Sequence, residues 1–515
     1  MPDARVVVVG AGVGGLCAAI ELACAGAQVT LLERAAEPGG KMRAPRVAGR
    51  PVDSGPTVFT MRWVFDALFA RAGARLDDHL KLEPLSILAR HAWDDGSTLD
   101  LHADLEASVD AIGSFAGARE AAGFREFSAR ARRIYRALEK PFLCGQRPNP
   151  ITLPLRAGWR GLPDMLKIDP FSGMWKQLGQ HFHDARLHQL FGRYATYCGS
   201  SPFHAPATLM LVAHVEQAGV WSVAGGMRAL PRALASLAQR HGVRLRCDAP
   251  VAEIVVERGR AAGVRLASGE HIEADAVVFN GDASALPMGR LGSAARAASP
   301  AVPRLERSLS ALTWSTVAQA EGFPLARHTV FFSGDYAAEF DTIERERRLP
   351  SDPTVYVCAQ DVADSGGTTT QPDAQRLLLL VNAPADGDQP GAFSGKEIDA
   401  CEQRMLARLS RCGLRLRMKP GATLRTTPVD FDHLFPATGG ALYGRASHGW
   451  RASFQRPSAA SRIPGLYLAG GSVHPGPGVP MAALSGSLAA QRLLADRAST
   501  WRLHPVVMPG GISTR

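Results

Sequence analysis

Short apolar runs separated by a helical pattern open the chain. Residues 5–9, RVVVV, consist mainly of β-branched valines, which is typical of a strand. Residues 16–25 have the composition of a helix, and residues 28–33, QVTLLE, predict a second strand that ends in an acid. The order strand, helix, strand predicts a parallel α/β unit at this end of the chain.

The pattern changes further along the chain. Residues 219–243 begin with a Gly-Gly turn and continue as an amphipathic helix. Strand-like apolar runs follow this helix at 244–247, 251–257, 261–269 and 274–282. Three more β-type runs lie at 329–332, 354–358 and 376–381. These last runs predict an antiparallel sheet covered by helices, and residues 364–375 predict a surface loop.

Glycines fill the turn between the first strand and the first helix. Gly10, Gly12 and Gly15 have GxGxxG spacing, and Gly14 lies in the same turn. Such glycines permit a tight turn, the approach of a pyrophosphate to the backbone, and close packing of the helix on the strand. Glu33 follows at the spacing expected of an acid that binds a ribose hydroxyl. The combination favours dinucleotide binding over a simple packing turn, and it does not separate NAD from FAD.

A second glycine turn follows the second strand. Gly40 permits another close approach of the backbone, and Lys41 and Arg43 add positive charge near the same phosphates. A surface turn with solvated charges is the alternative. Residues 52–60, VDSGPTVFT, then form a second loop that contains Gly and Pro.

Composition narrows the class of protein. The chain has 515 residues, which is enough for two or three domains. Its content of 46% hydrophobic and 21% charged residues is typical of a globular protein. The net charge of +10 suits an anionic partner, namely nucleic acid, an acidic membrane surface or a phosphate-bearing cofactor. Neither zinc-finger spacing nor an aromatic RNA-binding motif is present, so we expect no nucleic acid partner.

Cysteine usage and the N-terminus bear on location. The eight cysteines contain no CxxC pair, so we expect reduced thiols, no metal site and a cytoplasmic protein. The N-terminus lacks the pattern of a signal peptide, and no apolar run reaches the length of about 18 residues that a membrane span requires. Any membrane contact is therefore expected to be peripheral.

One segment, residues 124–142, predicts a basic amphipathic helix. The following residues share its apolar face: Phe124, Phe127, Ala131, Ile134, Tyr135, Leu138 and Phe142. The opposite face carries Arg125, Arg130, Arg132, Arg133, Arg136 and Lys140. Such a helix rests on anionic lipid or, alternatively, packs its apolar face into the core of a domain. Residues 157–182, apolar and interrupted by Pro and Gly, predict a membrane-facing entrance.

Four stretches together resemble one family. They resemble the FAD-dependent carotenoid desaturases of the bacterial phytoene desaturase type, within the amine-oxidase-like flavoproteins. The four stretches are the N-terminal unit, GGKMR (39–43), DSGPT (53–57) and LYLAGGSVHPGPGVP (466–480). The resemblance covers most of the chain and is weakest around residues 290–420. It implies an α/β fold, with a discontinuous Rossmann-like FAD-binding domain and a second, α+β substrate domain.

The resemblance also divides the chain. It implies an FAD-binding domain made of residues 1–80, 215–290 and 425–500. It implies a substrate domain made of residues 81–214 and 291–424. Residues 501–515 remain as a tail.

Further cofactor contacts follow from the resemblance. In such flavoproteins the C-terminal strand returns to the N-terminal domain, and the start of the next helix faces the flavin pyrimidine edge. The implied residues are Gly470, Gly471, Val479 and Met481. Bare glycines permit the approach, and the helix dipole stabilises negative charge on the reduced ring. A backbone group near Val251 would contact the adenine, although a structural strand without ligand contact is the alternative there.

Two stretches favour a subgroup. Residues 54–73 and 194–223 are most similar to the 1-hydroxycarotenoid 3,4-desaturases, also called methoxyneurosporene dehydrogenases. The implied reaction removes two hydrogens from C3–C4 of an acyclic 1-hydroxy or 1-methoxy carotenoid, with FAD as hydride acceptor. Phytoene desaturase, another flavoenzyme of this fold and, more remotely, a non-enzymatic binding module are the alternatives. Oxygen and a quinone are both candidates for the electron acceptor.

The implied chemistry predicts a sparse active site. Loss of hydride from an allylic carbon leaves a delocalised cation whose neighbouring proton is acidic, so no strong base is required and we assign no catalytic residue. Thr57, Arg62, Tyr197 and His474 are candidates for lining the substrate site, each with a packing, hydrogen-bonding or surface ion-pair alternative. For a partner of the substrate hydroxyl we expect the polar cluster of Tyr194, Thr196, Tyr197, Ser200, Ser201 and His204, together with Arg62.

Overall fold

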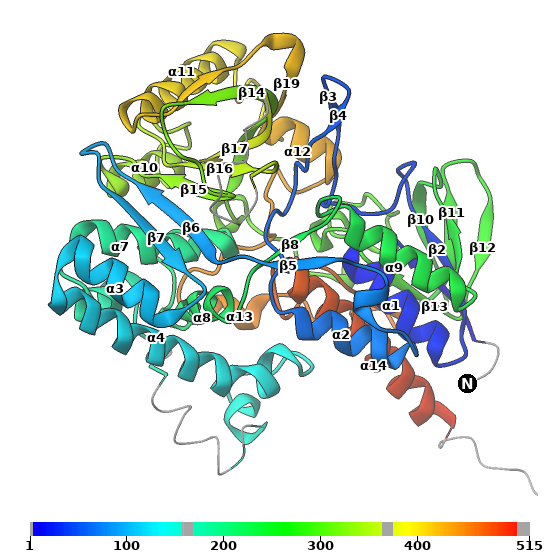
Figure 1. The fold of residues 1–515 in the computed structure, drawn as a ribbon. Helices are drawn as coiled ribbons and strands as arrows, with labels where there is room; N and C mark the ends of the chain where they lie inside the picture. The colour runs from blue at the N-terminus through cyan, green and yellow to red at the C-terminus, as the bar shows by residue number, and fades with distance from the viewer. Residues whose placement is uncertain (1–3, 157, 159–167, 170, 363–373, 502–515) are drawn as a thin grey trace, which may run out of the picture.

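The computed structural model of the chain describes residues 4–156, 158, 168–169, 171–362 and 374–501 (Figure 1). Three sequence predictions fall wholly or partly outside these residues. They are the entrance at 157–182, the loop at 364–375 and the tail at 501–515.

A five-stranded parallel sheet forms one half of the molecule. Its strand order is β20-β13-β1-β2-β9. The strands are β1 (Arg5–Val9), β2 (Gln28–Leu32), β9 (Arg244–Arg246), β13 (Ala276–Phe279) and β20 (Leu466–Leu468). Every neighbouring pair is parallel. The sheet therefore combines three distant parts of the chain, and the strands predicted at 5–9 and 28–33 are confirmed.

Helices cover this sheet and pack closely on one another. They are α1 (Val13–Cys24), α2 (Arg62–Arg71), α9 (Ala229–Arg240) and α14 (Val479–Trp501), grouped in one half of Figure 1. A Cβ atom built on Gly486 of α14 would lie 2.1 Å from the carbonyl oxygen of Gly14 in α1. Bare glycines thus let the backbones of the first and last helices touch, which brings the two ends of the chain together.

Smaller sheets complete this half. An antiparallel sheet consists of β10 (Val251–Glu257), β11 (Arg260–Leu266) and β12 (His271–Glu273), close to the runs predicted there. Two short pairs are β3 (Arg46–Val47) with β4 (Arg50–Pro51), and β5 (Leu82–Pro84) with β8 (Trp221–Val223).

A large mixed sheet forms the second half of the molecule. Its order is β18-β14-β17-β16-β15-β6-β7, with β19 also paired to β14. The strands are β6 (Ile87–Ala92), β7 (Thr98–His102), β14 (Ser310–Glu321), β15 (His328–Phe331), β16 (Val355–Ala359), β17 (Gln375–Ala383), β18 (Arg415–Arg417) and β19 (Thr423–Thr426). Most pairs are antiparallel as predicted, but β15 and β6 pair in parallel. This one pair joins a hairpin from the first hundred residues to strands that follow residue 300.

Helices surround the large sheet (Figure 1). They are α3 (Leu105–Ala116), α4 (Ala118–Leu138), α6 (Met174–His181), α7 (Ala185–Gly192), α8 (Leu211–Gln217), α10 (Tyr336–Glu344), α11 (Gly395–Arg411), α12 (Pro428–Leu434) and α13 (Ala452–Gln455). Figure 1 shows α3, α4 and α8 below β6 and β7, α7 beside these two strands, and α11 at the opposite end of the sheet.

Helix α4 settles one alternative left by the sequence. It continues into a π-helical turn at Glu139–Leu143, and all seven residues of its predicted apolar face are buried. Its apolar side therefore packs into the core of the domain and is not open to lipid. On the other side Arg125, Arg132, Arg133, Arg136 and Lys140 are exposed. Among the described residues, no helix is both long enough and apolar enough to cross a membrane.

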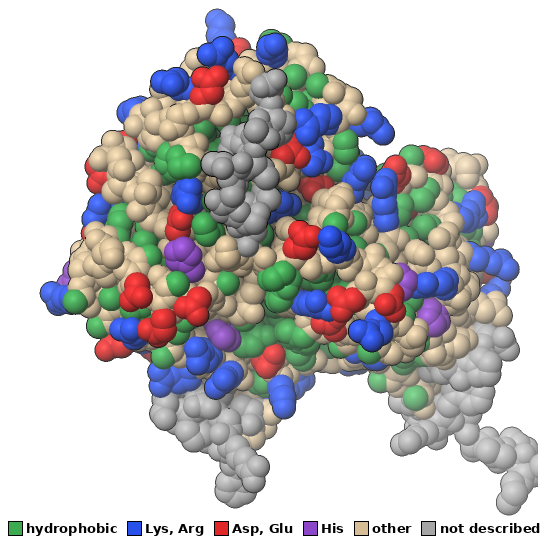
Figure 2. Space-filling view, viewed as in Figure 1, with side chains coloured by type: hydrophobic (Ala, Val, Ile, Leu, Met, Phe, Trp, Pro, Cys, Tyr) green, Lys and Arg blue, Asp and Glu red, His purple; other side chains and the backbone are tan. Residues whose placement is uncertain are grey.

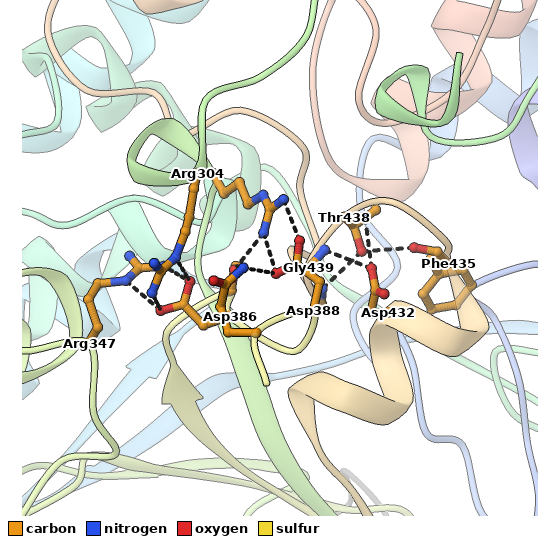
Figure 3. Close-up of polar contacts among 12 residues, drawn as sticks. Arg304, Arg347, Asp386, Asp388, Asp432, Phe435, Thr438 and Gly439 are labelled. Atoms are coloured by element: carbon orange, nitrogen blue, oxygen red, sulfur yellow. Dashed lines mark hydrogen bonds and ion pairs between the residues drawn. The ribbon is translucent and has the colours of Figure 1, made fainter. Parts of the chain in front are cut away.

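An ion-pair network fixes the loop that follows α12 (Figure 3). Asp386 accepts hydrogen bonds from Arg304 at 2.7 Å and from Arg347 at 2.6 Å. Burial opposes the charge of Asp386, but the two guanidinium groups prevail and lower its pKa to about 2. Next to it, Asp432 accepts hydrogen bonds from the backbone N–H of Thr438 at 3.0 Å and of Gly439 at 2.8 Å. The backbone N–H of Gly387 donates a hydrogen bond to the Gly439 carbonyl at 2.8 Å, which connects this loop to the segment that carries Asp386.

Replacing Gly486 with alanine is expected to destabilise the protein by about 1–3 kcal/mol, because the added methyl group meets backbone that no rotamer change can move. Thermal unfolding measures the effect. Gly395→Ala is the matched control, since a Cβ at that position has no atom within 4 Å. Equal melting temperatures for the two variants would contradict the close helix contact.

Candidate active site

One large cavity lies between the two halves of the molecule. Its volume is about 1750 Å³, and its lining runs from the glycine turn after β1 to the face of the large sheet. It includes residues as exposed as Phe171, at 71%, and as buried as Tyr336, at 6%. The cavity therefore extends from the surface into the interior, and a single ligand chain can reach both sheets.

The glycine turn forms one end of this cavity. Gly10, at φ +97°, makes the turn, and Gly12 caps α1 without any side-chain hydrogen bond. The first turn of α1 contains no acidic residue, so its free N–H groups and positive helix end are available to a phosphate. Gly14 also lines the cavity. Gly15 does not, and its role is packing, because a Cβ there would lie 2.0 Å from the Gly10 carbonyl oxygen.

Glu33 lies directly after β2, at the same end. Its carboxylate accepts hydrogen bonds from the backbone N–H of Ala11 at 2.8 Å and of Ala35 at 2.9 Å. These bonds fix a buried carboxylate at the cavity wall and leave lone pairs for a ribose hydroxyl. Val251, half-buried at the start of β10, also lines the cavity.

Asn280 is a site residue that the sequence analysis missed. Its Nδ2 donates a hydrogen bond to the Gly10 carbonyl at 3.1 Å, and its Oδ1 would lie 2.6 Å from a Cβ on Gly14. It follows β13, the neighbour of β1. A polar residue at the carboxyl end of a buried strand was the available signal, because ligands of parallel sheets bind at that edge.

Lys41 and Arg43 do not form a solvated surface turn. Lys41 Nζ donates a hydrogen bond to the Leu442 carbonyl at 2.5 Å, and Arg43 Nη2 donates one to Thr426 at 3.0 Å. Burial lowers the pKa of both side chains. Both line the cavity with Gly40, whose positive φ of +57° suits glycine. They therefore supply partly desolvated positive charge at the glycine-rich end, and the surface-turn alternative is wrong.

The C-terminal loop completes this end. Gly470, at φ +110°, donates its N–H to Ser485 at 3.2 Å and lies against Gly14. Gly471, Val479 and Met481 follow it in the cavity lining. The last two lie in the first turn of α14, which again has no acidic residue. The N-termini of two helices thus face one cavity, an arrangement that favours a ligand with negative charge at two places.

Arg456 is a second missed residue. It is buried in the cavity wall and donates hydrogen bonds to the carbonyls of Tyr443 at 2.9 Å and Arg445 at 2.6 Å. Burial lowers its pKa to about 10, so it stays protonated at neutral pH. It holds the loop at residues 443–445 against the C-terminal glycine loop.

The opposite end of the cavity is formed by a row of side chains on the large sheet. Thr313, Leu380, Tyr356 and Val330 are cross-strand partners in succession from β14 to β15, and all four line the cavity. Because they share one register row, they point to the same face of the sheet. This row provides a mainly apolar surface that suits an extended hydrocarbon chain.

Thr57 joins this surface by hydrogen bonds. Its Oγ1 lies 2.7 Å from the hydroxyl of Tyr356, and that hydroxyl lies 2.7 Å from Nδ1 of His328. Burial lowers the pKa of His328 to about 3, so its ring is neutral at physiological pH. The chain of three groups connects the DSGPT loop to the sheet.

Tyr197 also lines the cavity. It donates a hydrogen bond to Glu216 at 2.9 Å, and Tyr194 donates one to the other carboxylate oxygen. The guanidinium of Arg193 lies 5.0 Å from the centre of the Tyr197 ring. Of the polar cluster predicted to meet the substrate hydroxyl, only Thr196 and Tyr197 are among the described lining residues. The other members of the cluster lie outside this lining, and their contact with a substrate stays a prediction.

Arg62 and His474 are placed away from the described lining of the cavity. Arg62 pairs with Asp77 at 2.7 Å and with Asp66 at 3.2 Å. His474 is buried, and its Nε2 lies 2.9 Å from the carbonyl oxygen of Phe142. Burial lowers its pKa to about 4. Both side chains are occupied by structural contacts, which favours the ion-pair and hydrogen-bonding alternatives for these two residues.

Known proteins are similar to this chain in sequence or in fold. The chain matches the family described as flavin containing amine oxidoreductase over residues 13–494. The hydroxyneurosporene desaturase of Rubrivivax gelatinosus is 56% identical over 512 residues, which cover 99% of this chain and 97% of that protein. The hydroxyneurosporene desaturase of Cereibacter sphaeroides is 48% identical over 506 residues, 97% of this chain and 99% of that one. An oxidoreductase structure from Methanosarcina mazei has a TM-score of 0.58 at 16% identity and covers 95% of this chain and 100% of its own.

The chain therefore belongs to the flavin-containing amine oxidoreductases, and the predicted α/β fold class is confirmed. Within that family it is a member of the hydroxyneurosporene desaturase group, which confirms the subgroup resemblance found in the sequence.

Replacing Gly12 with valine is expected to abolish flavin binding, because the side chain would occupy the path of the pyrophosphate to the backbone of α1. The absorption spectrum of the purified, FAD-reconstituted protein measures the bound flavin. Gly421→Val is the control, since a Cβ there meets no atom within 4 Å. Normal flavin content in Gly12→Val would contradict the assignment of the glycine turn.

Proposed function

We propose that the protein binds FAD and removes two hydrogens from the C3–C4 bond of acyclic 1-hydroxy or 1-methoxy carotenoids, as a step of carotenoid biosynthesis. One observation carries the proposal. A single cavity has at one end the glycine turns and the N-termini of α1 and α14, and at the other end the mainly apolar surface on the large sheet. The 56% identity to a hydroxyneurosporene desaturase supports this substrate over phytoene, which remains the alternative.

The glycine-rich end fits FAD. Gly10, Gly12 and Gly14 leave the backbone open to a pyrophosphate, and Glu33 is fixed where a ribose would follow. The start of α14 offers its N–H groups at a second point of the same cavity. A bound flavin would supply the hydride acceptor.

The chain's own residues exclude water and orient the substrate. Val330 and Leu380 on the sheet, with Leu211, Val212 and Val215 from α8, surround the deep part of the cavity. Apolar walls keep the polyene extended and stabilise it by burial. A delocalised cation needs only a weak proton acceptor, so the neutral hydroxyl groups of Thr57 and Tyr356 suit the site without a charged base.

The outer part of the cavity suits an approach from a membrane. Leu138, Phe142 and Phe454 line it together with the exposed Phe171. Ile151 and Leu155, at 76% and 74% exposed, extend this apolar surface. Figure 2 shows Lys and Arg side chains along the neighbouring edge of the molecule, where α4 lies. We propose that this edge rests on the anionic inner face of a membrane, with the protein on the cytoplasmic side.

Purified, FAD-loaded protein in lipid is expected to convert 1-hydroxyneurosporene to a product with one more conjugated double bond, because the C4 hydrogen is allylic to the polyene. The absorption spectrum should move to longer wavelength, and chromatography should show the loss of two hydrogens. Phytoene is the comparison substrate. Efficient conversion of phytoene without conversion of the hydroxylated chain would overturn the proposed substrate.

Replacing Arg132, Arg133 and Arg136 with glutamine is expected to weaken binding to anionic vesicles, since these arginines are exposed on one side of α4. Binding of the unaltered protein should also fall with salt, because exposed charges are screened over about 8 Å at physiological ionic strength. Co-sedimentation with vesicles measures both effects.

The matched control replaces Arg244, Arg258 and Arg415, which are exposed elsewhere, with glutamine. It removes the same charge from other faces of the protein. Equal loss of vesicle binding in both triple variants would show that net charge, and not the α4 edge, governs the attachment.

A further inference from the structure

Two side chains at the buried end of the cavity each have a polar atom without a hydrogen-bond partner. Tyr336 is 6% exposed, lines the cavity, and its hydroxyl has no partner among the described residues. Arg193 is 7% exposed, also lines the cavity, and its Nε likewise has none. Buried polar groups in proteins are nearly always hydrogen-bonded, so two unpaired donors facing one cavity indicate a polar ligand group.

The ring of Tyr336 is held firmly. It begins α10 and packs against Phe340 at 5.1 Å, Phe332 at 6.0 Å and Phe203 at 6.2 Å between ring centres. These aromatic neighbours offer no acceptor for the hydroxyl. The hydroxyl position is thus set by ring packing, whereas the hydrogen bond is left for a group inside the cavity.

Arg193 lies among the polar groups of the same region. Its guanidinium stacks over Tyr197, and its charge acts on the pKa values of Tyr336, Tyr356 and His328. The negative charge of Glu216, which Tyr197 and Tyr194 bind, compensates that of Arg193. The pair keeps the buried end close to neutral and still presents a guanidinium donor to the cavity.

The rest of the cavity explains which ligand group is expected. Its outer part and the floor on the large sheet are lined mainly by aliphatic and aromatic side chains. An acyclic carotenoid carries oxygen only at its end, and the hydroxyl on C1 lies close to the C3–C4 bond. Thr313 on β14 also lines the cavity with an unpaired hydroxyl, so the unpaired groups of the described lining belong to Tyr336, Arg193 and Thr313. A chain that enters with this end first would place its single oxygen within this buried, partly polar region.

We propose that Tyr336 and Arg193 bind the oxygen on C1 of the carotenoid and so determine which chains react. This inference rests on the proposed function. Both protein groups are donors, and the substrate oxygen accepts from them. A methoxy oxygen also accepts hydrogen bonds, so the same pair admits 1-hydroxy and 1-methoxy chains and discriminates against a chain that ends in hydrocarbon.

The test replaces Tyr336 with phenylalanine, which keeps the packed ring and removes the unpaired hydroxyl. Purified, FAD-loaded protein is assayed with 1-hydroxyneurosporene, its 1-methoxy derivative and neurosporene. We expect kcat/KM for both oxygenated chains to fall about tenfold, the effect of losing one hydrogen bond, while the value for neurosporene stays unchanged. The ratio of these values is the readout, because a purely structural role would lower all three together.

Tyr467→Phe is the matched control. Tyr467 is buried in β20 and its hydroxyl is 3.1 Å from Asp496, so this variant also loses a buried phenol hydroxyl, but one outside the described lining. It should leave the ratio unchanged. Arg193→Met is the second variant and should lower the same ratio, with flavin absorption and thermal unfolding reporting on folding.

Two results separate the inference from the proposed function. If the unaltered protein converts the hydroxylated chain and Tyr336→Phe and Arg193→Met both keep its ratio to neurosporene, the inference is overturned and the proposed function stands. If the unaltered protein does not dehydrogenate any oxygenated chain, the proposed function is overturned and the inference with it.

Discussion

The contact between the backbones of α1 and α14 is the constraint on which the rest of the structure depends. A Cβ on Gly486 would lie 2.1 Å from the Gly14 carbonyl, and one on Gly14 would lie 3.1 Å from the N–H nitrogen of Gly470. No other residue type permits this approach. Because of it, the glycine turn after β1 and the loop before α14 form one wall, and both helix N-termini face the same cavity.

Local patterns predicted the parts of the fold that depend on local chemistry. The β-branched run at 5–9 and the glycines after it specify a strand and a turn almost by themselves. The parallel pairing of β15 with β6 could not be predicted in this way, because it joins segments more than 200 residues apart that carry no matching signal. The environment of α4 could not be predicted for a different reason: its amphipathic pattern fits both a membrane surface and a protein core.

The residues of the candidate site also divide into those that the sequence could predict and those that it could not. Glu33 and the glycines of the first turn were predicted as cofactor contacts because the GxGxxG spacing, and the number of residues from it to Glu33, can be counted in the sequence. The C-terminal loop was predicted from the family resemblance. Arg62 and His474 were assigned by their position near motifs, but their side chains turn to Asp77 and to the backbone. Arg193 and Tyr336 were missed because burial and an unpaired polar atom are visible only in the folded chain. Asn280 was missed although its position directly after a buried strand was an available signal.

One wall of the cavity consists of the glycine turn after β1 and the loop before α14, and this has a consequence for the synthesis of the protein. The cavity lacks a wall until Gly470 and the first turn of α14 have left the ribosome, although the glycine turn at Gly10 emerges first. Closing so long a loop is slow compared with local folding. A flavin therefore cannot be fully enclosed until the C-terminal loop has folded against the N-terminal turn.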